Sequence, residues 1–237
     1  MRIGIITGSI HPPKMNEGET TGTMYGEPSS PVYRFEIGDA EYRMIARHSI
    51  PSRIPPHRVN HRANVMALKE SGVECVISIC STGALKPEFE VPSIAVPEDF
   101  IDMTTIETFH DEDVYHITPS LDEHLRQALR MASSGAGIRL YGGGTYIQTS
   151  GPRLETKAEV RMLSNFGDYV GMNLASEAGL CCEVDLPVAG LITMDNHANG
   201  VTERELDFRD ILSDARSRWE MVLGILTRLP SFMGALD

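Results

Sequence analysis

The sequence is poor in the residues and spacings from which disulfides, metal sites and redox motifs are built. Its 237 residues include four cysteines, and no two of them form a Cys-x-x-Cys pair. Cys75 and Cys80 lie in or beside one apolar run, and Cys181 and Cys182 lie in another. We therefore expect free, buried thiols in a reducing cytosol, with no metal ligand or disulfide among them.

Positive charge is scarce as well, with 21 Lys and Arg against 33 Asp and Glu and a formal net charge of −12. A nucleic-acid-binding protein needs a basic face to neutralise phosphates, so this balance argues against that class. It does not exclude a small anionic substrate, which a few local arginines can bind. No apolar run is long enough for a secretory or membrane-spanning segment, so we expect a cytoplasmic protein without a membrane partner.

Short apolar runs alternate with segments of helical period, and this alternation predicts one α/β domain over residues 1–237. A chain of this length can bury a substantial core, and its sheet should be parallel or mixed with helices on both faces. The expected strands are residues 2–7, 33–37, 42–46, 75–80, 93–96, 139–141, 145–149 and 187–194. The expected helices are residues 60–72, 121–133, 157–166, 174–182 and 202–229.

The most informative segment follows the strand 145–149. A Gly-Pro turn at 151–152 delivers Arg153 and Glu155 into the start of the helix 157–166. Open α/β sheets place their chemistry where a tight turn follows a strand end. The pattern indicates a site for a small polar ligand, with Glu155 as an acceptor for ligand N–H groups.

Polar residues follow other expected strands in the same way. Ser9 comes after the first strand and suits an anion, although a plain turn explains it too. Arg47 and His48 follow the strand 42–46 and suit a phosphate, or else form a solvated loop pair. The residues Arg53, Pro55, Pro56, His57 and Arg58 are candidates for a rigid, positively charged rim of the same site.

Two more groups complete the candidates from the residues alone. Small residues from Ser81 to Ala84 allow a ligand to approach the backbone, or form a structural turn. Asn196 follows the strand 187–194, and its amide donates and accepts as an oxopurine edge requires, or simply makes a turn. His57 and His61 are four residues apart, but their proline- and arginine-rich surroundings do not favour a metal pair.

The motif Gly-Pro-Arg-Leu-Glu-Thr at 151–156, followed by Ala158-Glu159 and Gly171-Met172, resembles the purine nucleoside phosphorylase family. The similarity is to its trimeric branch, which includes methylthioadenosine and methylthioinosine phosphorylases. Residues 25–29, 46–48, 53–64, 67–69 and 100–102 also resemble family segments. The resemblance implies a single α/β domain around a distorted mixed sheet, a homotrimer or dimer of trimers, and cleavage of nucleosides by phosphate.

The resemblance also implies roles for individual residues. The phosphate-binding set would be Ser9, Arg47, His48, Ser81 and Asn173. The substrate-binding set would be Thr82, Gly83, Leu154, Glu155, Met172, Asn196 and His116, the last reaching into a neighbouring subunit. Asn196, Glu155 and His48 would be catalytic, with inorganic phosphate as co-substrate and no metal or cofactor.

The implied reaction stretches the glycosidic bond to an oxocarbenium-like sugar while phosphate waits on the opposite face. Asn196 would donate to the purine N7 and stabilise the charge on the departing base. The family generally uses Asn here for 6-oxopurines and Asp for 6-aminopurines, which favours inosine, guanosine or 5'-methylthioinosine. Asp195 is the adjacent residue, and a one-residue register shift would place its carboxylate at the site, which keeps adenosine and methylthioadenosine as alternatives.

Two positions depart from the family pattern and leave other functions open. The first glycine loop, Thr7-Gly8-Ser9-Ile10, has Ile10 where the family usually has glycine, and Asn173 replaces a usual Ser or Thr. Residues 106–114 and the segment after Gly200 look shortened. These departures favour a specialised substrate, and they keep two alternatives open: a nucleosidase that uses water, and a catalytically silent nucleoside-binding protein.

Overall fold

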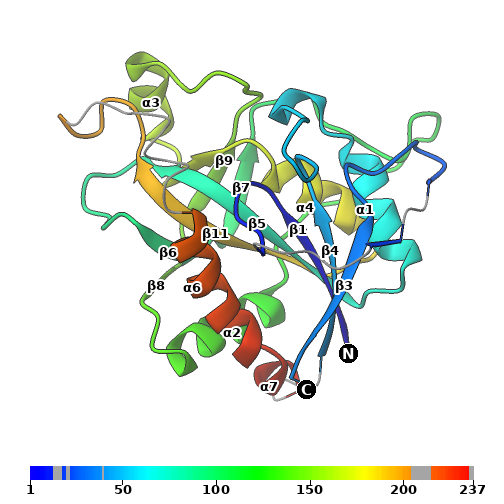
Figure 1. Cartoon of the computed structure of the whole chain (residues 1–237). Coiled ribbons are helices and arrows are strands. Elements are labelled where there is room, and N and C mark those ends of the chain that lie inside the picture. Colours follow the sequence, from blue (N-terminus) through cyan, green and yellow to red (C-terminus); the bar gives the residue numbers. More distant parts are fainter. Residues whose placement is uncertain (13–17, 20–21, 39, 204–214, 235–237) are drawn as a thin grey trace.

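The computed structural model describes residues 1–237 except 13–17, 20–21, 39, 204–214 and 235–237. Within the described residues, eleven strands join in one mixed sheet (Figure 1). The strands are β1 (Arg2–Thr7), β2 (Gly18–Glu19), β3 (Val32–Ile37), β4 (Ala40–Ala46), β5 (Cys75–Ala84), β6 (Ser93–Val96), β7 (Asp99–Asp102), β8 (Leu140–Gly142), β9 (Thr145–Gln148), β10 (Tyr169–Gly171) and β11 (Val188–His197). The helices are α1 (His61–Glu70), α2 (Glu123–Gly135), α3 (Lys157–Leu163), α4 (Leu174–Glu183), α6 (Ala215–Arg228) and α7 (Pro230–Met233), with a 3-10 turn at Pro56–Arg58.

The middle of the sheet is parallel. Strand β1 pairs with β4 and β5 in parallel, and β11 pairs with β5 in parallel along nearly its whole length. The carboxyl ends of these four strands therefore meet at one edge, where open α/β sheets bind ligands. Near that edge β5 also pairs with β10 in antiparallel fashion through Gly83 and Ala84, so the sheet branches there and is distorted.

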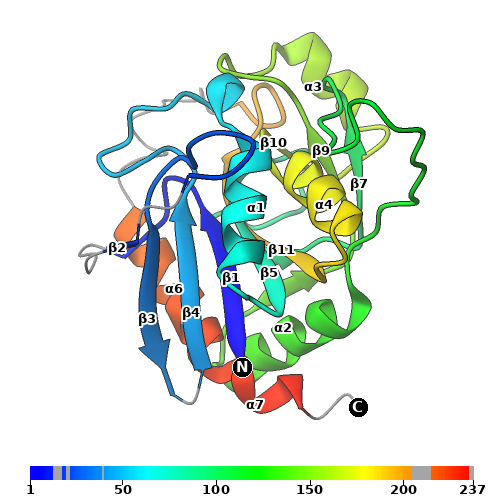
Figure 2. The ribbon, with the colours of Figure 1, turned by 90° about the vertical axis from the view of Figure 1, so that its right-hand side faces the viewer.

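Helices cover both faces of the sheet, α2 and α6 on one side and α1 and α4 on the other (Figures 1 and 2). Alternation along the strands explains the two layers, because successive side chains point to opposite faces. Ile77 and Ile79 of β5 pack with Leu129 of α2. Val76 and Cys80 of the same strand pack on the opposite face, in the cluster that contains Leu68 of α1 and Leu174 of α4.

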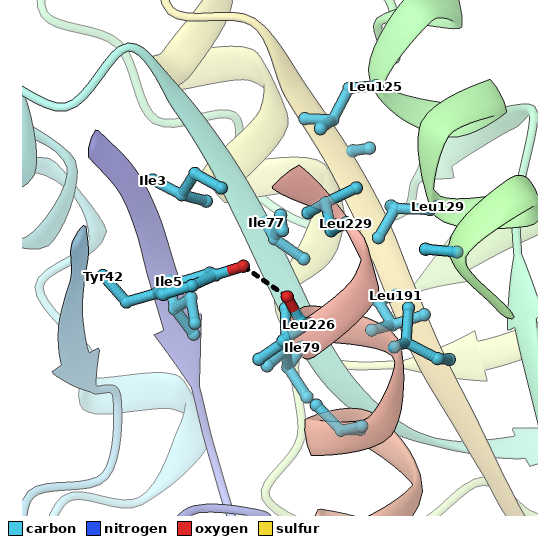
Figure 3. Packing of buried hydrophobic residues seen from close by; sticks show 14 of the residues in the cluster. Ile3, Ile5, Tyr42, Ile77, Ile79, Leu125, Leu129, Leu191, Leu226 and Leu229 are labelled. Carbon is cyan, nitrogen blue, oxygen red and sulfur yellow. Dashed lines mark hydrogen bonds between the residues drawn. The ribbon is translucent and has the colours of Figure 1, made fainter. Parts of the chain in front are cut away.

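Figure 3 shows the first of these layers, where α6 closes the core. The Tyr42 hydroxyl of β4 donates to the Leu226 carbonyl of α6 at 2.6 Å, so the one polar atom of this ring is satisfied. Burial raises the pKa of Tyr42 far above its ordinary value. Leu125 and Leu129, four residues apart in the sequence, both face this core as their helical spacing predicts.

Local sequence sets the helix starts. Asn60 and Asp122 cap α1 and α2 by accepting from the backbone N–H groups of Ala63 and Leu125. Thr156 and Glu159 form a reciprocal capping box at the start of α3. This box ends the Gly-Pro motif and fixes the point at which the chain turns away from the site.

The predicted fold class is confirmed, and several predicted boundaries are wrong. Strand β5 continues to Ala84 and β11 to His197, so Ser81, Thr82, Gly83 and Asn196 lie inside strands instead of after them. The short strands β2, β7 and β10 were not predicted, and α3 ends at Leu163 rather than at 166. Residues 202–203 are not helical, 204–214 lie outside the described residues, and α6 begins at Ala215.

Candidate active site

A cavity of about 780 Å³ opens at the carboxyl edge of β1, β4, β5 and β11. Most of the side chains that the sequence singled out line it. From the predicted sets, the lining includes Ser9, Arg47, His48, Ser81, Thr82, Gly83, Leu154, Glu155, Met172, Asn173 and Asn196. The strand ends therefore bring together residues as far apart in the sequence as Ser9 and Asn196.

Arg47 is the deepest charged group in the cavity wall, with 2% of its surface exposed. Its guanidinium forms a two-point ion pair with Glu177 of α4, through Nε–Oε1 at 2.5 Å and Nη2–Oε2 at 2.8 Å. Its Nη1 also donates to the Ile79 carbonyl at 3.2 Å. Burial by itself would raise the pKa of Glu177, but Arg47 holds it at about 2, so both groups are charged.

The amide of Asn173 also acts on Arg47. In the orientation that satisfies both ends of the amide, its oxygen accepts from Arg47 Nη2 at 3.0 Å and from the Leu174 N–H at 3.2 Å. Asn173 begins α4 but its side chain does not cap the helix. Asn173 therefore orients Arg47 and also lines the cavity.

His48 stands beside Arg47 as a neutral ring. Burial, followed by the nearby positive charge of Arg47, lowers its pKa to about 4. Its Nδ1 lies 2.8 Å from the Ile54 carbonyl and donates to it, which leaves Nε2 as an acceptor in the neutral ring. Near neutral pH His48 can therefore accept from a protonated ligand oxygen through Nε2.

Gly8 allows this end of the cavity to be compact. A Cβ on Gly8 would lie 2.9 Å from Arg47 Nη1 and 3.3 Å from His48 Nε2. Ile10, two residues further on, points away from the site, because it is 1% exposed and packs in the core cluster with residues of α2 and α6. The unusual Ile10 therefore stabilises the fold and takes no space from the cavity.

Glu155 lines the opposite part of the cavity. Its Oε1 accepts from the Thr149 hydroxyl at 2.6 Å, and its backbone carbonyl accepts from Asn199 Nδ2 at 3.2 Å. Among the described residues, Oε2 has no hydrogen-bond donor. Glu155 is 9% exposed, so a carboxylate oxygen is available in a sheltered place to a ligand N–H.

Met172 and Gly151 form a close contact on the same side. Gly151 has φ +61, and a Cβ there would lie 2.5 Å from Met172 Sδ. Glycine is therefore required for both the backbone conformation and the packing. Leu154, 39% exposed, adds an apolar surface next to Glu155.

Asn196 reaches the cavity through a β-bulge. The pairing of β11 with β5 shifts between Met194 and Asn196, so no residue of β5 lies opposite Asp195 in the strand register. Asn196 Nδ2 donates one hydrogen bond to the His197 carbonyl at 2.7 Å, and this amide nitrogen carries a second N–H group. Asp195 does not line the cavity; its side chain is fully buried against Arg218 of α6.

Four predicted residues do not line the cavity. His116 is exposed and does not line the cavity of its own chain. Arg153 is exposed and pairs with Glu159 at 2.7 Å, so it belongs to the start of α3. Of the predicted rim, Arg53, Pro55 and Pro56 line the cavity, whereas His57 and Arg58 do not.

Two important residues were missed by reasoning from the sequence. Asn199 lines the cavity and holds the backbone of Glu155. Glu177 lies in the otherwise apolar run 174–182, and a carboxylate in a buried helix needs a cationic partner. That isolated charge was the signal that the sequence offered, but it did not identify Arg47 as the partner.

An open α/β sheet with a polar cavity at its carboxyl edge is typical of an enzyme that binds a small polar substrate. The arginine end suits an anion, and the carboxylate–amide end suits a heterocycle with both donors and acceptors. The family is established by comparison: the model described as "Phosphorylase superfamily" matches residues 2–229, and the chain belongs to that family. The resemblance read from the sequence is confirmed.

Named relatives cover nearly the whole chain. It is 39% identical over 229 residues to a probable 6-oxopurine nucleoside phosphorylase of Archaeoglobus fulgidus, covering 94% of this chain and 93% of that one. It is 35% identical to a probable S-methyl-5'-thioinosine phosphorylase of Thermodesulfovibrio yellowstonii, covering 90% and 83%. Methylthioadenosine phosphorylase of Schistosoma mansoni, solved in complex with adenine, superposes with a TM-score of 0.91 at 25% identity, covering 100% and 92%.

Proposed function

We propose that this protein is a pentosyltransferase that cleaves 6-oxopurine nucleosides with inorganic phosphate. Inosine, guanosine or 5'-methylthioinosine would give the free base and a ribose 1-phosphate, substituted at carbon 5 in the last case. The observation that carries the proposal is a single cavity with Arg47 and Ser9 at one end and Glu155 and Asn196 at the other. Relatives named as 6-oxopurine and methylthioinosine phosphorylases support it.

The chemistry follows from this two-ended arrangement. Glu155 accepts from a ring N–H of the purine, and Asn196 donates to N7 as negative charge develops on the departing base. The sugar passes through an oxocarbenium-like state, over Met172, while a phosphate oxygen attacks carbon 1 from the other face. The proposal needs no metal or cofactor, because side chains meet each developing charge.

At the phosphate end, hydrogen bonding matters more than net charge. Glu177 compensates the charge of Arg47, and His48 is neutral. Arg47, which reaches the cavity wall beside Gly8, and the loop at Ser9 would donate to the anion. Nε2 of His48 would accept from the remaining P–OH of phosphate.

The position of Asp195 favours 6-oxopurines over 6-aminopurines. In this arrangement Glu155 accepts from a ring N–H, so a 6-amino group would need a second carboxylate, and Asp195 is held away from the cavity. The two departures that left a nucleosidase open, Ile10 and Asn173, support it less in the structure, because Ile10 packs in the core and Asn173 contacts Arg47. A silent binding protein would have no need of a buried, oriented arginine in its cavity wall.

We also propose a homotrimer or dimer of trimers in the cytoplasm. Support for the assembly comes from the segment that carries His116, where Ile106 and Val114 are 75% and 92% exposed. Apolar side chains on one exposed segment fit a subunit contact that would place His116 near a neighbouring cavity. Support for the compartment comes from the four cysteines, all free. Within the described residues, no helix is long and apolar enough to cross a membrane.

One assay tests the activity. The protein is incubated with inosine and with methylthioinosine, with and without phosphate, and free hypoxanthine is followed. We expect release that depends on phosphate. Release without phosphate would mean hydrolysis, and binding without turnover across a nucleoside panel would contradict both enzymatic readings.

A further inference from the structure

Either Asp195 or Asn196 could direct its side chain into the base end of the cavity, and the bulge in β11 determines which of the two does so. Strand β11 is in register with β5 up to Met194, opposite Thr82, and resumes at Asn196, opposite Gly83. Because side chains alternate along a strand, Asp195 follows Leu191 to the face covered by α6, whereas Met194 packs on the other face. The extra residue then re-aims Asn196 into the cavity.

Two groups hold Asp195 in the bulge. The Ser81 hydroxyl donates to Oδ2, and Arg218 Nε lies 3.2 Å from Oδ1. The side chains of Arg218 and Asp195 are 3% and 0% exposed, so the ion pair is fully enclosed. Burial raises the pKa of Asp195, while Ser81 and Arg218 act in the opposite direction.

The same contacts decide what the cavity presents. The Ser81 hydroxyl lines the cavity but donates its hydrogen bond to Asp195, so it can only accept a hydrogen bond from a ligand. Asn196 presents an amide to the base. Arg218 lines no part of the cavity, and its Nε lies beside the Asp195 carboxylate instead.

We propose that Arg218 is a positioning residue that sets base preference: by holding Asp195 in the bulge, it presents the amide of Asn196 to the purine and withholds a carboxylate. This inference rests on the proposed function, because it assumes that Asn196 faces the base. Without Arg218, the buried carboxylate keeps the Ser81 hydroxyl but loses its compensating charge, and it gains solvent and ligand donors by turning toward the cavity. A carboxylate there accepts from a 6-amino group, so 6-aminopurines should gain relative to 6-oxopurines.

The test compares kcat/KM for inosine and adenosine at saturating phosphate in wild type, Arg218→Met and Arg218→Lys. We expect Arg218→Met to lower the inosine-to-adenosine ratio roughly tenfold or more. Arg218→Lys keeps the cation and should retain most of the ratio. Ser217→Ala, an exposed neighbour on α6, is the matched control and should leave the ratio unchanged.

A second variant separates the carboxylate from loss of packing. Adding Asp195→Asn to Arg218→Met removes the carboxylate and should return the ratio to within about threefold of wild type. If Arg218→Met does not fold, the same ratio is read on Arg218→Gln. An equal loss of activity toward both nucleosides would reduce the pair to a structural role and overturn the inference. Absence of phosphorolysis in the wild type would instead refute the proposed function.

Discussion

The ion pair between Arg47 and Glu177 is enclosed, so replacing either partner should lower the stability of the protein strongly. In Glu177→Gln, the guanidinium of Arg47 stays buried, 2% exposed, without a compensating charge. The neutral amide can accept from one nitrogen, but it cannot replace the carboxylate that Arg47 and Ser78 share. His61, with Nδ1 3.5 Å from Glu177 Oε1, also loses its acidic neighbour.

The expected loss of stability is large. Removing one partner of a buried ion pair typically lowers the free energy of unfolding by about 3–5 kcal/mol. For a chain of this size, each kcal/mol corresponds to about 2–4 °C in Tm, so the shift should be roughly 6–20 °C. The exposed pair Arg139–Glu90, with both side chains more than two-thirds exposed, supplies a matched control. There Glu90→Gln should change stability by less than about 1 kcal/mol.

The assay is urea unfolding at a fixed protein concentration, since an assembly makes stability depend on concentration. The single variant Arg47→Met and the double variant Arg47→Met/Glu177→Gln complete the cycle, and the loss in the double variant should be smaller than the sum of the two single losses by about 3 kcal/mol or more. In parallel, Glu177→Gln should raise the KM for phosphate because Arg47 is no longer oriented. A loss below about 1 kcal/mol, equal to that of Glu90→Gln, would refute the reasoning about the buried pair.

Three further outcomes are expected. Asn196→Asp should shift kcat/KM toward adenosine by roughly tenfold or more, and an unchanged ratio would remove Asn196 from base recognition. Gly151→Ala, where φ is +61 and a Cβ would lie 2.5 Å from Met172 Sδ, should raise the nucleoside KM far more than the phosphate KM; equal changes would contradict a contact on the sugar side. Because the pKa of His48 is lowered to about 4, the unfolded chain takes up a proton that the folded chain does not as pH falls below about 6.5. Stability should therefore fall by at most about 3 kcal/mol between pH 6.5 and 4, and His48→Gln should show less of this loss in urea titrations; identical slopes would exclude His48 as the cause.

The sheet was predictable to the extent that its strands are apolar. The strand 75–80 was recognised because six successive residues suit a buried parallel strand. Its continuation through Ser81, Thr82 and Gly83 has no such signal. That extension exists because β11 and β10 supply backbone partners from distant parts of the chain, which a local pattern does not encode.

The types of residue in the site could be predicted from the sequence, but the balance of charge between them could not. Glycine, serine, arginine and asparagine at strand ends marked the cavity correctly, since parallel strands bring those ends together. The sequence did not show that Arg47 is compensated by Glu177, because the partners are 130 residues apart. Nor did it decide between Asp195 and Asn196, because a bulge of one residue exchanges them.

These contacts explain how a chain of net charge −12 can bind phosphate as proposed. Arg47 is neutralised by Glu177 and His48 is uncharged, so the buried part of the anion end has almost no net charge. Binding there depends on oriented N–H groups in a sheltered wall, where hydrogen bonds to an anion are strong. Arg53, exposed at the rim, adds positive charge where solvent screens it. In the proposed site, orientation would determine the affinity for phosphate more than charge does, and for this reason we expect Glu177 to affect the reaction although it does not line the cavity.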